Sequence, residues 1–131
     1  MGNNPPPGAL PSPLPENHPV CKAVKRGDLE RLQRALEGVE KPNSAKNNNG
    51  CTLYYWAACF NQPHIMQWLF SIGGCNPNAQ KNTGWTPGMS AMHNSSLHAF
   101  LLWLHHGGDP NIANMDGKTA PHEDFAKNDN T

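Results

Sequence analysis

Apolar residues in this chain occur in short runs, separated by polar segments rich in Asn, Gly and Pro. In one run, Ile65, Met66 and Leu69 share a face by their i, i+1, i+4 spacing, which is typical of an amphipathic helix. Pro before a run and Gly after it mark helix ends. The pattern predicts helices over residues 19–25, 28–37, 53–59, 63–72, 87–93 and 97–105, and one further short helix before residue 127.

The helical segments recur with a nearly constant period. The phrase Gly-x-Thr starts at Gly50, Gly84 and Gly117, so the spacing is 34 and then 33 residues. A polar segment ending near Asn78 or Asn111 closes a unit. A period in this range, with two short apolar helices per unit, indicates a helical repeat array. Such arrays mostly present extended binding surfaces.

The residues that carry the repeat resemble those of the ankyrin-repeat family. The match covers about residues 18–131 and is clearest in the third unit. The positions that match there are Thr86, Pro87, Ala91, Leu104, Gly107, Asp109 and Asn111. The second unit keeps Thr52, Ala57, Ala58, Leu69 and Asn78, and a divergent first unit keeps Pro19, Ala23, Gly27, Asp28, Leu32 and Leu36.

The resemblance implies an all-α repeat fold, in which helix-turn-helix units form an ankyrin solenoid and are joined by β-hairpin fingers. About three units and a partial C-terminal unit are expected, at residues 18–49, 50–83, 84–116 and 117–131. Residues 1–17 hold six prolines among polar residues. Such a segment cannot bury enough apolar surface to offset its ordering entropy, so we expect a disordered tail.

Several residues depart from the family pattern. Gly88 stands where the family has a core Leu, a truncation that costs on the order of 2–4 kcal/mol if the neighbours do not collapse. Tyr55 and Met89 replace the motif His, and Pro121 and Asp124 interrupt the last unit. We therefore expect a marginally stable array that frays at its C-terminal end. A partner, or self-association through this uncapped end, would complete it.

Composition and charge narrow the classes of protein. The formal net charge is zero, which argues against nucleic acid or an acidic membrane surface as a partner. No apolar stretch approaches the roughly 20 residues that cross a bilayer, and the start lacks the features of an export signal. We expect free thiols and a cytoplasmic protein small enough to enter the nucleus passively.

Candidate chemistry is weak throughout. The segment 88–92 resembles a nucleophile elbow around Ser90, but it lacks the second Gly and the surrounding α/β pattern. His105 and His106 are adjacent on a helix, so both rarely bind one ion. Cys51, Cys59 and Cys75 lack zinc-ligand spacing. We expect no catalytic residue, metal site or cofactor, and thus no enzyme.

The resemblance implies that an unidentified protein partner docks on the finger tips and on the concave face of the first helices. Phe60 and Trp85 are the expected anchors, since aromatic residues dominate interface hot spots. Trp85 could equally provide packing between fingers, and each position could be an ordinary solvated loop. The positions are Asn48, Asn49, Cys51, Asn82, Thr83, Trp85, Met115, Asp116 and Lys118 on the fingers, and Cys59, Phe60, His93 and Asn94 at the helix ends.

Three hypotheses for function stay open at this point. The first is an adaptor or inhibitor that occupies a partner's surface. The second is a substrate of an oxygen-dependent asparaginyl hydroxylase, which in this family modifies the Asn at the end of a unit, here Asn78 or Asn111. The third is a truncated or degenerate ankyrin copy with little function of its own, which Gly88 and Pro121 favour.

Overall fold

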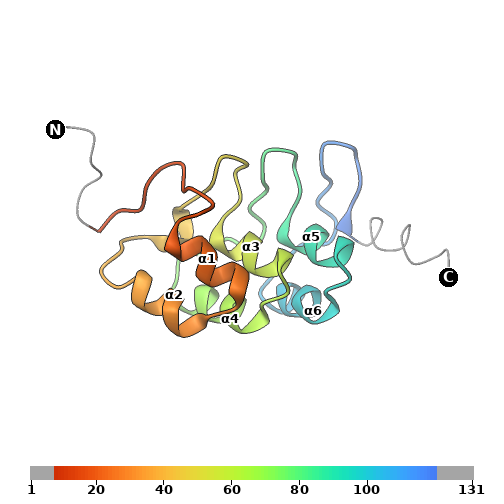
Figure 1. Ribbon diagram of the computed structural model, residues 1–131. Coiled ribbons are helices and arrows are strands. Elements are labelled where there is room, and N and C mark those ends of the chain that lie inside the picture. Colours follow the sequence, from red (N-terminus) through yellow and green to blue (C-terminus); the bar gives the residue numbers. More distant parts are fainter. Residues whose placement is uncertain (1–7, 121–131) are drawn as a thin grey trace.

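Three antiparallel helix pairs form the body of the chain in a computed structural model, which describes residues 8–120 (Figure 1). The prediction of paired helices in successive units is confirmed. The helix boundaries differ from those expected by two residues at most. The helices are α1 (Pro19–Arg26), α2 (Leu29–Ala35), α3 (Leu53–Cys59), α4 (Pro63–Ser71), α5 (Pro87–His93) and α6 (Leu97–His105), with a short 3₁₀ helix η1 (Pro42–Ser44).

The helices form two rows, with hairpin fingers rising from one of them (Figure 1). Helices α1, α3 and α5 make the inner row beside the fingers, and α3 contacts both of its neighbours there. Helices α2, α4 and α6 make the outer row, and each packs on the inner helix of its own unit. Each unit therefore buries its apolar side against the next one.

The threonine of the repeated phrase caps two of the inner helices, α3 and α5. The Thr52 hydroxyl oxygen accepts a hydrogen bond from the backbone N–H of Tyr55 at 3.0 Å. Thr86 does the same for Met89 at 3.3 Å. These are N-cap hydrogen bonds, which satisfy backbone donors that have no partner within the helix. Replacing the motif His by Tyr55 and Met89 therefore leaves the caps intact.

Tyr55 also ties the second unit to the third. Its side chain is 3% exposed, and the Ser90 hydroxyl donates to its phenolic oxygen at 2.7 Å. Burial raises the pKa of Tyr55, so the phenol is neutral at physiological pH. A buried hydroxyl pair of this kind fixes the position of α3 relative to α5.

The cavity expected at Gly88 is absent, because Trp103 of α6 fills it. A Cβ atom at Gly88 would lie 2.3 Å from ring carbons of Trp103, and one at Gly108 would lie 2.2 Å from them. The indole is fully buried, and its N–H donates to the carbonyl of Pro77 at 2.7 Å. The condition under which Gly88 would weaken the core, a space that its neighbours leave empty, is therefore not met.

The expectation of a disordered tail was wrong for residues 8–17, while residues 1–7 lie outside the described part of the chain. Leu14 is 3% exposed, and its N–H donates to the Lys46 carbonyl at 2.9 Å. The N–H of Glu40 donates to the Gly8 carbonyl at 2.7 Å. By the 34-residue register, this segment stands where a first finger would be. Backbone pairing and one buried leucine hold it there.

Each finger is a narrow hairpin whose turn is closed by a repeated pattern of backbone hydrogen bonds. The N–H of Lys81 donates to the Trp85 carbonyl at 2.9 Å, and the other two fingers repeat this bond. Within residues 8–120 the fingers form no strand, only an isolated antiparallel bridge between Lys46 and Thr52. The recurring glycine has a physical cause, since Gly84 adopts a φ of +86° and a Cβ there would meet the next finger.

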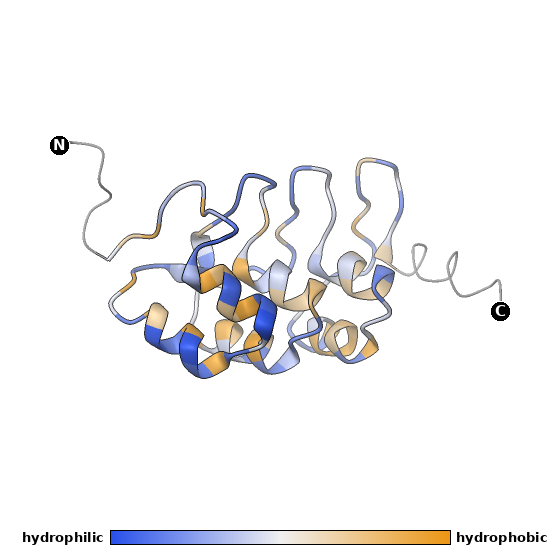
Figure 2. Cartoon of the chain, viewed as in Figure 1, coloured by the Kyte–Doolittle hydropathy of each residue, from blue (hydrophilic) through white to orange (hydrophobic). Residues whose placement is uncertain are grey.

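The C-terminal end of the array leaves apolar side chains exposed on α6, which is strongly hydrophobic (Figure 2). Leu97 and Leu101 are 60% and 54% exposed. In α4, one unit earlier, the exposed Gln67 occupies the position equivalent to Leu101. Pro121, Asp124 and the short helix expected before residue 127 lie outside the described residues. Fraying and self-association at this end therefore stay predictions.

We expect Gly88→Ala to destabilise the chain, although alanine favours a helix over glycine by roughly 1 kcal/mol. The added methyl must displace the buried Trp103 ring, and overpacking of this kind should lower the free energy of unfolding by about 2 kcal/mol. Urea melts of G88A and of the exposed-helix control Gln67→Ala provide the measurement.

A double variant tests the same contact independently. Combining Gly88→Leu with Trp103→Leu exchanges a small–large pair for two medium residues. The double variant should therefore lose less free energy of unfolding than the sum of the losses of the two single variants. Additive free energies would contradict direct packing between Gly88 and Trp103.

We expect the chain to lose stability in acid because of two partly buried histidines. Burial lowers the pKa of His18, whose Nδ1 caps α1, and of His106, which is stacked on Phe70, below the ordinary value of 6.5. The unfolded chain then binds more protons, so stability is retained above about pH 6.5 and declines as the pH falls through the folded values.

The control for this effect keeps a cap that does not titrate. When the pH is lowered from about 8 to about 5, the melting temperature of the double variant His18→Asn, His106→Gln should fall markedly less than that of the natural chain. If the melting temperature of the double variant falls as much as that of the natural chain, the acid sensitivity belongs to other groups.

Candidate protein-binding surface

Most of the predicted finger residues are accessible at the tips. Asn48, Asn49, Asn82 and Thr83 are exposed, as are Asp116 and Lys118, and Met115 is 77% exposed. Cys51 differs, because it lies at the base of its finger and is only 8% exposed. Burial raises the pKa of this thiol. Cys51 is therefore not available for a direct contact with a partner.

Hydrogen bonds between neighbouring fingers hold the tips together. The backbone N–H of Asn82 donates to the Asn49 carbonyl at 2.8 Å, and the Asn82 side-chain amide donates to the Asn48 carbonyl at 3.0 Å. In the next pair, the N–H of Met115 donates to the Thr83 carbonyl at 3.1 Å. The three fingers therefore form one connected edge, which lowers the entropy cost of binding a partner.

Phe60 lies at the end of α3 among residues that the sequence reasoning did not select. It is 36% exposed, and its ring meets the edge of Trp56 at a centroid distance of 5.6 Å. The ammonium group of Lys25 lies 5.7 Å from the centre of the Phe60 ring. Phe60 is therefore one member of a small aromatic and cationic cluster.

The repeat register could have identified this cluster. Shifting by 34 residues aligns the inner helices, so Lys22 of α1 corresponds to Trp56 of α3. Lys25 corresponds in the same way to Cys59, and Arg26 to Phe60. We call the surface formed by the accessible residues of the inner helices and finger bases the inner face. Its members used below are Lys22, Lys25, Arg26, Trp56, Phe60, Lys81, Trp85 and His93.

Trp85 is half-buried at the base of the second finger. Its ring meets the ring of His93 edge-on, with centroids 5.4 Å apart. The ammonium of Lys81 lies 5.7 Å from the centre of the Trp85 ring and 5.8 Å from that of Tyr55. The indole thus packs on its own unit and still presents part of its surface.

Lys81 reaches these rings because it occupies a special position in its finger. The equivalent residues of the other fingers, Asn47 and Asn114, brace the turn by accepting two backbone N–H groups each. In the middle finger the side chain of Gln80 donates to the Gly84 carbonyl at 2.7 Å. The Lys81 side chain is then free to extend over the aromatic rings.

Asn94 is partly occupied by a contact between units. Its side-chain amide donates to the Cys59 carbonyl at 3.0 Å and approaches the Cys59 sulfur at 3.5 Å. His93, one residue earlier, is exposed beside Trp85. Among the helix-end residues selected from the sequence, Phe60, His93 and Asn94 are exposed, whereas Cys59 is half-buried.

The two candidate hydroxylation sites differ in their environment. The Asn78 amide group donates to the Gly107 carbonyl at 3.1 Å and accepts from the Asp109 N–H at 2.7 Å, so it links two units. Asn111 is exposed, and its backbone N–H donates to the Asp109 carboxylate at 2.9 Å. Asn111 is therefore the more accessible of the two.

The residues weighed for chemistry serve packing roles. Ser90 is 7% exposed and donates its hydroxyl to Tyr55. The ring of His106 stacks on Phe70 at 4.1 Å, and its Nδ1 lies 2.7 Å from the Tyr54 oxygen. Across residues 8–120, no group of three or more His, Cys, Asp or Glu side chains is placed to hold a metal ion. Over the same residues, no helix combines the length and the apolar character needed to cross a membrane.

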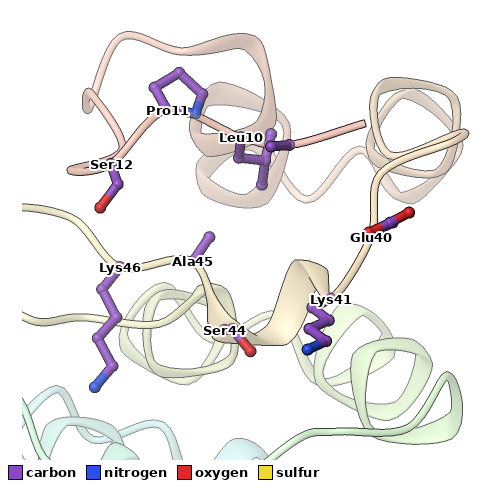
Figure 3. A pocket seen from close by; sticks show the side chains of 9 residues that line it. Leu10, Pro11, Ser12, Glu40, Lys41, Ser44, Ala45 and Lys46 are labelled. Carbon is purple, nitrogen blue, oxygen red and sulfur yellow. The ribbon is translucent and has the colours of Figure 1, made fainter. Parts of the chain in front are cut away.

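A pocket of about 310 Å³ lies between the N-terminal segment and the loop that contains η1 (Figure 3). Leu10 and Ala45 face each other across it, and Glu40 and Lys41 lie at one end. It offers no nucleophile paired with a base.

The family of this chain follows from its match to known repeats. A family model described as ankyrin repeats in three copies matches residues 20–114. This chain belongs to the ankyrin-repeat family.

Similar curated proteins are much longer than this ankyrin-repeat chain. The 26S proteasome non-ATPase regulatory subunit 10 of Dictyostelium discoideum is 32% identical over 90 residues, which cover 69% of this chain and 39% of the relative. Palmitoyltransferase ZDHHC13 of Homo sapiens is 27% identical over 107 residues, which cover 81% of this chain and 17% of the relative. The chain therefore spans well under half of the length of these relatives.

Proposed function

We propose that this ankyrin-repeat chain is an adaptor or inhibitor that recognises a partner protein through its finger tips and inner face. Ankyrin repeats are in general protein–protein interaction modules. The observation that carries the proposal is two partly accessible aromatic groups, Trp56 with Phe60 and Trp85 with His93, beside a connected edge of fingers. Aromatic side chains with a rigid surround are the usual centres of interface affinity.

The mechanism is recognition by a preformed surface. The Tyr55–Ser90 hydroxyl pair and the Asn94–Cys59 contact fix the inner helices relative to each other. The bonds from Asn82 to the first finger fix the tips. A partner then binds without ordering this surface first, which preserves more of the contact energy as affinity.

We also propose that the chain carries out no covalent chemistry. Ser90 is buried and already hydrogen-bonded, so it is poorly placed to act as a nucleophile. The filled site around Trp103 argues against the alternative of a degenerate copy, since the core substitution at Gly88 is compensated.

Hydroxylation of an asparagine is a second candidate role, favoured by the exposure of Asn111. Incubation of the purified chain with an oxygen-dependent asparaginyl hydroxylase should add one oxygen atom to Asn111 in preference to Asn78, whose amide is held between units. Tandem mass spectrometry locates the added mass. If the enzyme modifies neither Asn78 nor Asn111, this second role is excluded.

The binding proposal is tested by removing its two expected anchors. The full chain serves to capture a partner from a cell lysate, and the affinity for the purified partner is then measured by calorimetry. Replacing Phe60 and Trp85 by alanine should weaken binding by about tenfold or more. Circular dichroism should show that the helical fold is retained, because Phe60 is exposed and Trp85 is only partly buried.

The matched control changes exposed residues on the outer row. Gln33→Ala and Gln67→Ala remove side chains from α2 and α4 at equivalent positions. Partner affinity should stay within about twofold of the natural chain. Equal affinity of the anchor variant and the natural chain would show that the partner uses a different surface.

A further inference from the structure

We infer that the partner segment recognised by the inner face is an acidic peptide with apolar residues next to its carboxylates. The carboxylates would meet Lys22, Lys25 and Arg26 on α1, and the apolar side chains would meet Trp56 and Phe60 on α3. This inference rests on the proposed function and adds the chemistry of the partner to it.

The register of the repeats separates the inner face into chemically different zones. At equivalent positions, α1 carries Lys22, Lys25 and Arg26, whereas α3 carries Trp56, Cys59 and Phe60. The third unit carries Ser90, His93 and Asn94 there. At these helical positions charge is therefore confined to the first zone, and aromatic surface follows in the second. A further cation of the inner face, Lys81, belongs to a finger and lies beside Trp85.

The cations of the first zone are not neutralised by carboxylates of their own surface. Helices α1, α3 and α5 contain no Asp or Glu. Within residues 8–120, Lys22, Lys25 and Arg26 form no ion pair within 4.0 Å, whereas Arg31 and Arg34 of α2 pair with Asp28 and Glu30.

Two carboxylates flank the inner face without entering the zones. Glu16 lies beside Lys22 and Lys25 on the N-terminal segment, and Asp116 lies at the tip of the last finger. Three cations thus face one carboxylate at the first zone. This local imbalance exists although the formal charge of the whole chain is zero.

The basic and aromatic zones form one continuous surface. The ammonium of Lys25 lies 5.7 Å from the centre of the Phe60 ring, which joins α1 to α3 directly. Packed helices are about 8–10 Å apart, and an extended peptide advances about 3.3 Å per residue. A peptide crossing from α1 to α3 therefore needs its acidic and apolar residues within about three positions of each other.

A peptide fits this surface better than nucleic acid does. Phosphate backbones are bound by many cations along a groove, typically about 6–10 contacts for a protein with strong salt dependence. Here the basic zone ends after one helix, and Trp56 and Phe60 follow it. Complementary charge next to an aromatic anchor is typical of protein interfaces.

The test uses short synthetic peptides and the full chain. One peptide carries a block of glutamates next to a block of leucines. Control peptides replace the glutamates by glutamines or the leucines by serines, and a single-stranded oligothymidylate of similar length represents nucleic acid. Tryptophan fluorescence titrations should give the highest affinity for the first peptide, with binding that weakens as salt is added.

Matched variants assign the carboxylate contact to α1. The pair Lys25→Gln and Arg26→Gln should weaken binding of the acidic peptide by about tenfold. The pair Arg31→Gln and Arg34→Gln removes the same charge from the exposed side of α2, so it should change affinity by less than about twofold. Equal losses in both pairs, or the highest affinity for oligothymidylate, would overturn the inference.

The captured partner separates this inference from the proposed function. If alanine at Phe60 and Trp85 weakens binding of the partner but glutamine at Lys25 and Arg26 does not, the proposed interaction surface is supported and the acidic character of the partner segment is contradicted. If neither pair changes the affinity, both proposals fail.

Discussion

The stacking of one helix pair on the next is the constraint on which the rest of this structure depends. Short helices of seven to nine residues are not stable alone in water, so they persist only by burying their apolar sides against neighbours. Ile65, Met66 and Leu69 of α4 are fully buried in this way. Hydrogen bonds such as Ser90 to Tyr55 then lock the stacked units in one register.

This register decides which substitutions the array tolerates. In the second unit Tyr54 and Leu69 occupy the positions that Gly88 and Trp103 occupy in the third. The large and the small residue have exchanged helices, and the volume between the inner and outer rows remains filled. A departure from the family pattern therefore has to be judged together with the residue that faces it.

The sequence was sufficient to predict the helices and their pairing, because Thr52, Thr86 and the apolar spacing act within a single unit. It was insufficient for features that depend on contacts across units. The filling of the Gly88 site by Trp103 required knowing which residues face each other. The order of residues 8–17 required knowing that Leu14 has a buried site beside the first unit.

The same distinction applies to the binding surface. Phe60 and Trp85 could be selected from the repeat phrase alone, and both are accessible. Lys25 and Trp56 were missed, because their importance comes from the neighbours that stacking gives them. Cys51 was selected by its position in the finger and is buried.

A repeat array can change its partner without changing its fold, because the two depend on different positions of the same register. Positions that face neighbouring units, such as Ala57 and Ala91, are fully buried and small. Positions equivalent to Lys25 and Phe60 face outward from the inner row and vary from unit to unit. Stability thus constrains the buried set of residues, while the exposed set determines which partner binds. The basic zone and the aromatic zone lie side by side because stacking places successive units next to each other.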